Sequence, residues 1–382
     1  MSQILICGGG VGGLVTAHRL RRWLPATDQI IVFDQQSTHT FSPSLPWVMT
    51  GTRTADQVTR PLQALRERGI TVVDGVISAM DPVARTVSVG NQTWQGDVLV
   101  IALGAALDPG SIPGLIEGGD NVYTLSGAEQ AFEHLQTMDR GRVVVLISRT
   151  PFKCPAAPYE VAMLVDGYLK KKRRRKSVEV EVWAAEAAPM GVAGQVVSQS
   201  VVAALTQRDI SYHPNEVVTE VDVSARTLNF QSGRTTPYDL LLYVPPHRVP
   251  NIVSDVGLAS PDGWIAVDRH TLETRHPNVF AIGDVTGIPL AMGKPLPKAG
   301  VFAHAQGEVV ARIISHRLSG ENGADTFNGH GECFIEMGSG VAGFARGNFY
   351  AEPSPAVRTF RSGRHWHAAK VAFERHWWSQ WW

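Results

Sequence analysis

The chain has 382 residues, of which 44% are hydrophobic and 18% are charged, so it is long enough for two globular domains and an appendage. Its formal net charge is zero, which excludes a global basic field, and we expect no nucleic-acid partner. Three cysteines are too few for a secreted disulfide scaffold. We also expect no signal peptide, no transmembrane segment and no metal site.

Predicted strands and helices alternate along most of the chain. The predicted strands lie at residues 3–8, 30–33, 143–147, 178–183 and 279–282, and the predicted helices at 14–23, 159–169 and 299–318. Residues 70–100 are expected to form short antiparallel strands, and residues 215–245 form a further strand-rich region. Strand–loop–helix units open both halves, which indicates an α/β fold with two Rossmann-like domains.

The first strand runs into a glycine-rich turn. Gly8, Gly10 and Gly13 have the G-x-G-x-x-G spacing, and Asp34 ends the next strand. Gly10 lets the backbone approach a pyrophosphate, and Gly13 lets the helix pack on the strand with its N-terminus facing the anion. Asp34 would accept hydrogen bonds from a ribose. The unit predicts a dinucleotide site; the alternative is a glycine-rich turn of an unrelated α/β protein.

Two further segments decide which dinucleotide is expected. Residues 276–284 end in Gly283 and Asp284, and residues 97–104 end in Gly104. Both segments resemble FAD motifs of the pyridine nucleotide-disulfide reductase superfamily, so we expect FAD at this site. The predicted cofactor-binding residues are Gly8, Gly10, Val11, Gly12, Gly13, Asp34, Pro46, Ile77, Gly104, Gly283, Asp284, Lys298 and Gly300.

The second strand–loop–helix unit has no phosphate-binding turn. After the strand at 143–147 the chain reads Ser148-Arg149-Thr150-Pro151-Phe152-Lys153-Cys154-Pro155. The two prolines remove amide donors, and bulky side chains block approach to the backbone. We therefore expect electrons from a donor other than NAD(P)H. Cys154 precedes the helix, whose N-terminus is expected to favour the thiolate.

Four segments carry a more specific resemblance: residues 41–48, 297–300, 331–333 and 367–374. Together with the cysteine loop they resemble sulfide:quinone oxidoreductase and the flavoprotein of flavocytochrome c sulfide dehydrogenase over nearly the whole chain. The resemblance implies a redox pair, Cys154 and Cys333, that oxidises sulfide to sulfur or polysulfide, with two electrons passing through FAD to a membrane quinone. It places Cys333 on the flavin side and makes Cys154 the sulfur carrier.

Other residues receive roles from the same resemblance. Glu160 is a candidate proton handler, or else a first-turn carboxylate favoured by the helix dipole. Lys298 is expected to place positive charge near the flavin, or else to be a solvated loop lysine. Phe344, Phe360 and Phe373 are candidate quinone-lining residues, with core packing as the alternative.

The chain also departs from the family pattern. Residues 122–125 lack the third cysteine of many such quinone reductases, and residues 190–193 lack a histidine found in some. Ser42 stands where the flavocytochrome type often attaches its flavin through a cysteine, so non-covalent FAD is expected.

The C-terminal tail is rich in tryptophan. A helical stripe of Trp366, Phe373, Trp377 and Trp381 predicts a peripheral, monotopic anchor at the lipid bilayer surface. The alternative is a helix docked on the chain's own core or on a partner copy; whether a homo-oligomer forms stays open. The basic run 170–176 either attracts anionic lipid or is a solvated helix end.

These expectations define three regions. Residues 1–105 with 260–320 form an FAD domain, 106–259 form a second Rossmann-like domain without a nicotinamide motif, and 321–382 carry the second cysteine and the membrane-interface tail. Three rival functions remain: a sulfide dehydrogenase that reduces a cytochrome, an NADH:quinone oxidoreductase, and a flavin-binding sensor without turnover.

Overall fold

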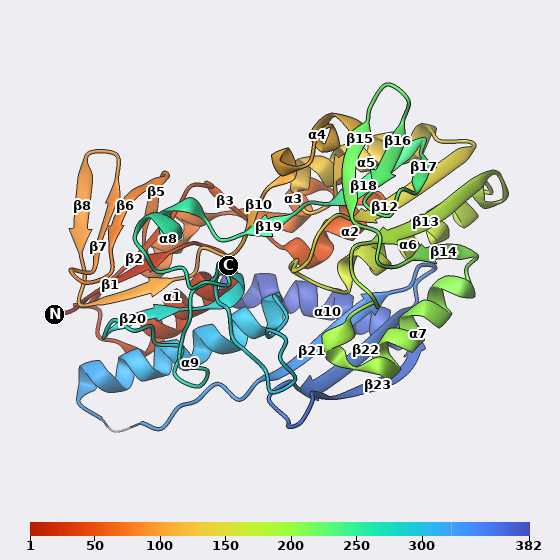
Figure 1. The fold of residues 1–382 in the computed structure, drawn as a ribbon. Helices are drawn as coiled ribbons and strands as arrows, with labels where there is room; N and C mark the ends of the chain where they lie inside the picture. The colour runs from red at the N-terminus through yellow and green to blue at the C-terminus, as the bar shows by residue number, and fades with distance from the viewer. Residues whose placement is uncertain (322) are drawn as a thin grey trace.

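The computed structural model describes residues 1–321 and 323–382, and Figure 1 shows two parallel sheets in opposite halves of the molecule. The first sheet has the strand order β20-β9-β1-β2-β5. Its strands are β1 (Gln3–Cys7), β2 (Gln29–Asp34), β5 (Thr71–Asp74), β9 (Val98–Ile101) and β20 (Val279–Ala281). Their apolar residues are buried almost completely, as expected for a parallel sheet that is covered on both faces.

Two helices, α1 (Val11–Trp23) and α9 (Gly300–Ser319), pack closely beside this sheet. The contact depends on glycine, because a Cβ on Gly307 of α9 would lie 2.7 Å from the carbonyl oxygen of Gly12 in α1. Gly13 also lacks room for a side chain, since its Cβ would lie 1.9 Å from the carbonyl oxygen of Gly8. The predicted role of Gly13 in helix packing therefore fits the geometry.

The second sheet has the order β11-β18-β12-β13-β14, and all its neighbouring strands are parallel. Its strands are β11 (Asp120–Asn121), β12 (Gly141–Ile147), β13 (Val178–Ala184), β14 (Ile210–His213) and β18 (Leu240–Val244). Helices α5 (Leu125–Thr137), α6 (Ala157–Lys171) and α7 (Gln195–Thr206) accompany it. The predicted α/β fold with two Rossmann-like sheets is confirmed.

One expected region is partly different. We expected antiparallel strands throughout residues 70–100, but β5 and β9 belong to the parallel sheet and only β6 (Ile77–Asp81), β7 (Thr86–Val89) and β8 (Gln92–Gln95) pair antiparallel. Runs of four apolar residues are too short to show pairing direction. The other short elements are α2 (Leu45–Met49), α3 (Ala55–Val58), α4 (Leu115–Gly118), α8 (Asn251–Asp255), β3 (Thr38–Thr40), β4 (Thr59–Pro61), β10 (Ala106–Leu107), β15 (Val218–Asp222), β16 (Thr227–Phe230), β17 (Thr235–Pro237) and β19 (His247–Arg248).

The chain ends in a small antiparallel sheet and a long helix. The sheet contains β21 (His330–Glu336), β22 (Ala342–Asn348) and β23 (Ala356–Gly363), and α10 (Arg364–Trp381) follows it. Figure 1 shows α10 beside this sheet, and its far end contacts α1 of the first Rossmann half. The C-terminal region therefore spans both halves of the molecule.

The tryptophan stripe of α10 does not face outward as we expected. Trp377 and Trp381 are only 3% and 2% exposed and belong to the hydrophobic core formed with α1 and α9. Phe373 alone in the stripe is well exposed, at 41%. These two tryptophans are docked on the chain's own core, which is the alternative that the sequence left open. Within the described residues, no helix combines the length and apolarity needed to cross a bilayer.

Candidate functional site

Two neighbouring cavities lie in the molecule. The larger of the two, of about 740 Å³, lies where α1 and α9 begin. Helix N-termini present unpaired amide groups and favour anions, so two of them at one cavity suit a pyrophosphate. Most of the predicted cofactor-binding residues line this cavity. They are Gly8, Gly10, Val11, Gly12, Asp34, Pro46, Ile77, Gly104, Gly283, Asp284 and Gly300.

The glycine turn is shaped for close approach by a ligand. Gly8 has a φ of +108°, and a Cβ there would lie 2.4 Å from the Ala102 carbonyl oxygen. A Cβ on Gly10, in contrast, would meet no protein atom within 4 Å, because Gly10 borders the cavity. Asp34 Oδ2 accepts a 2.6 Å hydrogen bond from Gly9 N–H, which holds the carboxylate at the cavity wall.

Asp284 supplies the second test of the cofactor. Its Oδ1 atom is buried and has no hydrogen-bond partner among the described residues, although Asp284 lines the cavity. Burial raises the pKa of this carboxyl, and Lys153 and Lys298 partly oppose that shift. An unpaired buried acceptor is costly, so a ligand with hydroxyl groups fits this position. A dinucleotide with a polyhydroxy chain therefore fits the residues present.

A second cavity, of about 570 Å³, adjoins the first. Cys154 and Cys333 both line it, although 179 positions separate them in the chain, and Lys298 and Glu186 line it as well. Cys154 also lines the larger cavity, whereas Cys333 does not. This arrangement is opposite to the expected placement of Cys333 on the flavin side. Cys154 lies at the boundary between the two cavities.

Cys154 contacts the first residue of α6, but its surroundings disfavour a thiolate. Its backbone has a φ of +50°, its N–H donates to the Lys298 carbonyl, and its carbonyl accepts from Ala157 N–H and the Tyr123 hydroxyl. Burial and the nearby Glu160 carboxylate raise the pKa of the Cys154 thiol to about 12. The expectation that the helix N-terminus lowers this pKa is wrong, because desolvation outweighs the helix contribution. Burial likewise raises the pKa of Cys333.

Lys298 is buried rather than solvated. Its ammonium donates to the carbonyls of Asp284 and Thr286 at 2.8 and 3.0 Å, and it lies 3.1 Å from the centroid of the Trp264 ring. Burial lowers its pKa to about 7, while Asp284 and Asp262 oppose that shift. Because this pKa is close to neutral pH, a small change in its surroundings would change the protonation of Lys298.

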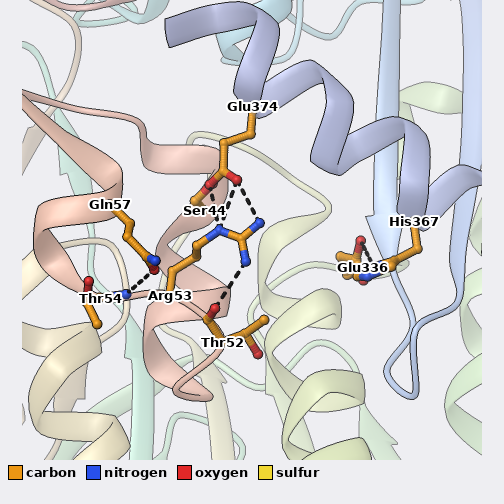
Figure 2. Close-up of polar contacts among 8 residues, drawn as sticks. All are labelled: Ser44, Thr52, Arg53, Thr54, Gln57, Glu336, His367 and Glu374. Atoms are coloured by element: carbon orange, nitrogen blue, oxygen red, sulfur yellow. Dashed lines mark hydrogen bonds and ion pairs between the residues drawn. The ribbon is translucent and has the colours of Figure 1, made fainter.

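Glu160 belongs to a buried charged cluster. Its Oε1 accepts from Lys370 Nζ at 2.9 Å and from Glu336 N–H at 2.8 Å. The Glu336 side chain faces His367, whose Nδ1 lies 3.0 Å from both carboxylate oxygens, as Figure 2 shows. Glu160, Lys370 and Glu336 are each at most 5% exposed. Glu160 is therefore more than a carboxylate stabilised by the helix dipole alone, because a buried lysine and a backbone amide also bind it.

The profile of the pyridine nucleotide-disulphide oxidoreductase family matches residues 2–147 and 158–307, which is most of the chain. The chain belongs to this family. Its members share the paired dinucleotide folds described above, and family membership implies an FAD cofactor, in agreement with the glycine turn and Asp284. The predicted superfamily and the oxidoreductase class are confirmed.

Similar proteins agree with the more specific resemblance. The chain is 26% identical to sulfide-quinone reductase of Aquifex aeolicus over 98% of its own length and 90% of the relative. It is 25% identical to the mitochondrial sulfide:quinone oxidoreductase of Mus musculus over 92% of this chain and 79% of that protein. The crystal structure of the Aquifex aeolicus sulfide:quinone oxidoreductase superposes with a TM-score of 0.90 and 25% identity, covering 100% of this chain and 91% of that one.

Within this family member, the predicted quinone residues form an aromatic cluster outside both cavities. Phe344 contacts Phe360, with ring centroids 5.6 Å apart, and stacks on Trp366 at 4.3 Å. Phe334 joins Phe344 to Phe373. The structure therefore brings the three predicted phenylalanines into one cluster and adds Phe334 and Trp366, which the sequence analysis did not assign to it.

Glu186 was also missed. It lines the cysteine cavity and accepts a short hydrogen bond from the Tyr159 hydroxyl. Burial raises the pKa of its carboxyl to about 7. Its position at the end of β13 was available from the sequence, but no motif linked it to either cysteine.

The basic run at 170–176 is partly neutralised by ion pairs. Lys170 and Arg175 both contact Asp166 at 2.8 Å, and Arg174 contacts Asp139 at 2.9 Å. Residues 171–173 of the run are exposed, which agrees with the alternative of a solvated helix end.

Proposed function

We propose that the chain is an FAD-dependent sulfide:quinone oxidoreductase that oxidises sulfide at Cys154 and Cys333 and passes two electrons to a membrane quinone. One observation carries this proposal: both cysteines line one cavity, and Cys154 also borders the cavity that suits FAD. The two relatives that carry this activity in their names cover nearly the whole chain, which supports the substrate class.

The reaction is balanced when a hydrosulfide ion is the donor: HS⁻ + H⁺ + quinone gives sulfur and quinol. The two electrons leave sulfide, and the sulfur stays on a cysteine until further sulfide releases it as sulfur or polysulfide. FAD, when bound, accepts the electron pair and passes it on singly or together. Gly8, Gly10, Asp34 and Asp284 are the residues that would hold its pyrophosphate and hydroxyl groups.

The chain's own side chains supply the conditions for this reaction. The raised pKa values of both thiols keep them protonated until a base takes the proton, and Glu160 is the carboxylate that acts electrostatically on both. Most of the exposed surface of the cysteine cavity is apolar, which suits neutral H₂S and elemental sulfur. Lys370 forms a buried ion pair with Glu160, with Nζ 2.9 Å from Oε1.

The FAD is proposed to be non-covalent. Ser42 lines the larger cavity at the position where the flavocytochrome type often has a cysteine, and a serine hydroxyl does not form a thioether. The proposal of non-covalent FAD is thus supported by the serine at position 42.

We place the enzyme at the membrane surface, because a membrane quinone is dissolved in the bilayer. The support is the exposed Phe373 beside Phe334 and the half-buried Trp366 in the same aromatic cluster. Trp377 and Trp381 take no part in this surface, since they are core residues.

The loop from Ser148 to Pro155 argues against NADH as donor. Arg149 of this loop donates hydrogen bonds to the carbonyls of Ser148 and Val218, and Ser148 donates to the Val244 carbonyl. These groups are engaged with the protein backbone and offer no phosphate cradle. Sulfide is therefore the favoured donor in this proposal.

The test is anaerobic reduction of the purified holoenzyme. We expect sulfide, and not NADH, to bleach the flavin, and Cys154→Ser and Cys333→Ser to retain FAD yet lose most sulfide-dependent quinone reduction. The double variant should be no worse than either single one, because the two residues act as a unit. Cys7→Ala is the control, since Cys7 is buried in β1 and lines neither cavity. Rapid bleaching by NADH, or a single variant with normal turnover, would overturn the proposal.

A further inference from the structure

The starting observation is a pair of buried acidic residues on different elements. Glu160 lies on α6 and Glu336 ends β21, and their exposed fractions are 4% and 1%. Carboxylates without water need charged partners or protons. Lys370 of α10 provides one positive charge that acts on both carboxylates. One ammonium between two carboxylates leaves the cluster with room for an additional proton.

The second observation is the position of His367. It lies one helical turn before Lys370 on α10, and its Nδ1 is 3.0 Å from both oxygens of Glu336. Its side chain is 31% exposed, whereas the Glu336 side chain is 1% exposed. Figure 2 shows His367 reaching from α10 to Glu336, while Glu374 on the same helix binds Arg53 and Ser44. His367 therefore contacts the buried Glu336 carboxylate and is also accessible to solvent.

We propose that Glu336 and His367 form a proton-exchange route between solvent and the buried Glu160–Lys370 pair. The imidazole takes a proton from water on one ring nitrogen and releases the other proton toward Glu336, as a histidine shuttle does. Glu336 adjoins the pair, because its backbone N–H donates to Glu160 Oε1 at 2.8 Å and Lys370 Nζ donates to the same oxygen at 2.9 Å. Lys370 takes up the proton from this side after it has given its own proton to Glu160. The route does not include Cys154 or Cys333. It assigns a role to Glu336 and His367, which no sequence pattern connects.

The inference rests on the proposed function, because that reaction consumes protons. Oxidation of one HS⁻ with reduction of one quinone to quinol takes one proton from solvent per turnover. Two protons enter the quinol oxygens, and only one can come from HS⁻. Glu160 borders the FAD cavity, and Lys370 lies one turn from Phe373 of the aromatic cluster. A buried pair at this place requires exchange with solvent at every turnover.

The charges around Glu336 agree with a group that changes protonation. Burial and the neighbouring Glu160 raise its pKa, while Lys370 and His367 lower it, with burial as the largest cause. Lys370 in turn faces Glu160, Glu336 and Cys333, and its ammonium lies 4.8 Å from the Trp47 ring centroid. The raised pKa brings Glu336 closer to the range in which a carboxyl exchanges protons near neutral pH.

The experiment compares His367→Gln and Glu336→Gln with the matched control His365→Gln, whose ring is exposed on the first turn of α10. We expect flavin bleaching by sulfide to be unchanged in all three holoenzymes. Quinone reduction above neutral pH should fall about 10²-fold in the first two, the low end of what a positioned proton-transfer group contributes. Added imidazole should restore the rate of His367→Gln and leave Glu336→Gln unchanged.

A readout independent of turnover is the infrared titration of buried carboxyl groups in the holoenzyme. One carboxyl band should disappear in Glu336→Gln, and its titration should move in His367→Gln but not in His365→Gln. Normal quinone reduction and an unmoved carboxyl titration in His367→Gln would overturn the route. Loss of sulfide bleaching in the wild-type protein would instead overturn the proposed function, so the two failures are distinguishable.

Discussion

Removal of the Lys370 ammonium tests whether the buried ion pair holds the C-terminal helix in place. In Lys370→Met, the methionine fills similar volume, but among the described residues Glu160 then keeps the Glu336 N–H as its single hydrogen-bond donor. Breaking a buried ion pair by removing one partner costs about 3–5 kcal/mol, because the other charge stays buried and uncompensated. Loss of the contact with the Trp47 ring places the expected cost toward the upper end of that range.

The assay is urea unfolding of the FAD-loaded protein at pH 7, followed by flavin and tryptophan fluorescence. Lys170→Met is the matched control. Lys170 pairs with Asp166 at 2.8 Å, close to the 2.9 Å of Lys370 and Glu160, but its side chain is 49% exposed and Arg175 also binds Asp166. Its expected cost is within about 1 kcal/mol, as for other surface ion pairs. The double variant Glu160→Gln with Lys370→Met should recover much of the stability, because the amide leaves no buried charge.

Equal stability of Lys370→Met and Lys170→Met would refute the reasoning. So would a double variant as unstable as the single one, because the loss would then come from packing rather than from an unpaired carboxylate.

Two further predictions concern the FAD cavity and the histidines beneath α10. Gly10→Val should fold normally and lose FAD, because its side chain would meet no protein atom but would occupy ligand space; a variant that purifies fully yellow contradicts this. Burial lowers the pKa of His18 and of His39 to about 4 in the folded state, below the ordinary value near 6.5. The unfolded chain therefore binds more protons between these values, so stability is complete above about pH 6.5 and is lost as pH falls toward 4, by about 3 kcal/mol for His39. Urea midpoints between pH 7 and 4.5 should show the loss, and His39→Phe should flatten it.

The local part of the fold could be predicted from the sequence. A buried strand, a glycine turn and a helix follow one another within residues 3–23, so periodicity and glycine spacing were sufficient. Asp284 was assigned through the resemblance of its contiguous strand and turn to an FAD motif. These are short-range patterns, and each residue type has a direct steric or polar reason to stand at its position.

The charged cluster could not be predicted in the same way. Glu160 meets Glu336 and Lys370 across 176 and 210 positions, on a helix, a strand and a second helix. No periodic pattern encodes such a contact; only the packed structure reveals it. The family resemblance made Glu160 a candidate proton handler, but it gave no reason to connect that residue with His367.

The tail shows a different limit. The spacing of its tryptophans correctly indicated an apolar helix face, but amphipathicity does not say whether lipid or protein covers that face. Here α1 and α9 cover it: His304 of α9 lies within 6.2 Å of the Trp377 ring, and Arg19 of α1 lies over Trp381. The pKa of the Cys154 thiol shows the same limit. The sequence indicated a helix N-terminus next to Cys154, but it did not indicate how deeply the thiol is buried.

The loop after β12 connects the choice of donor with the position of the cysteine. A glycine-rich turn at this place would bring a nicotinamide dinucleotide to the FAD cavity through backbone amides. Here the loop carries Pro151 and Pro155, which offer no amide hydrogens, and places Cys154 at the boundary of both cavities. The residues that remove the phosphate cradle therefore lie in the same segment as the thiol at that boundary. A small donor that reacts at a sulfur atom, such as hydrosulfide, fits this arrangement.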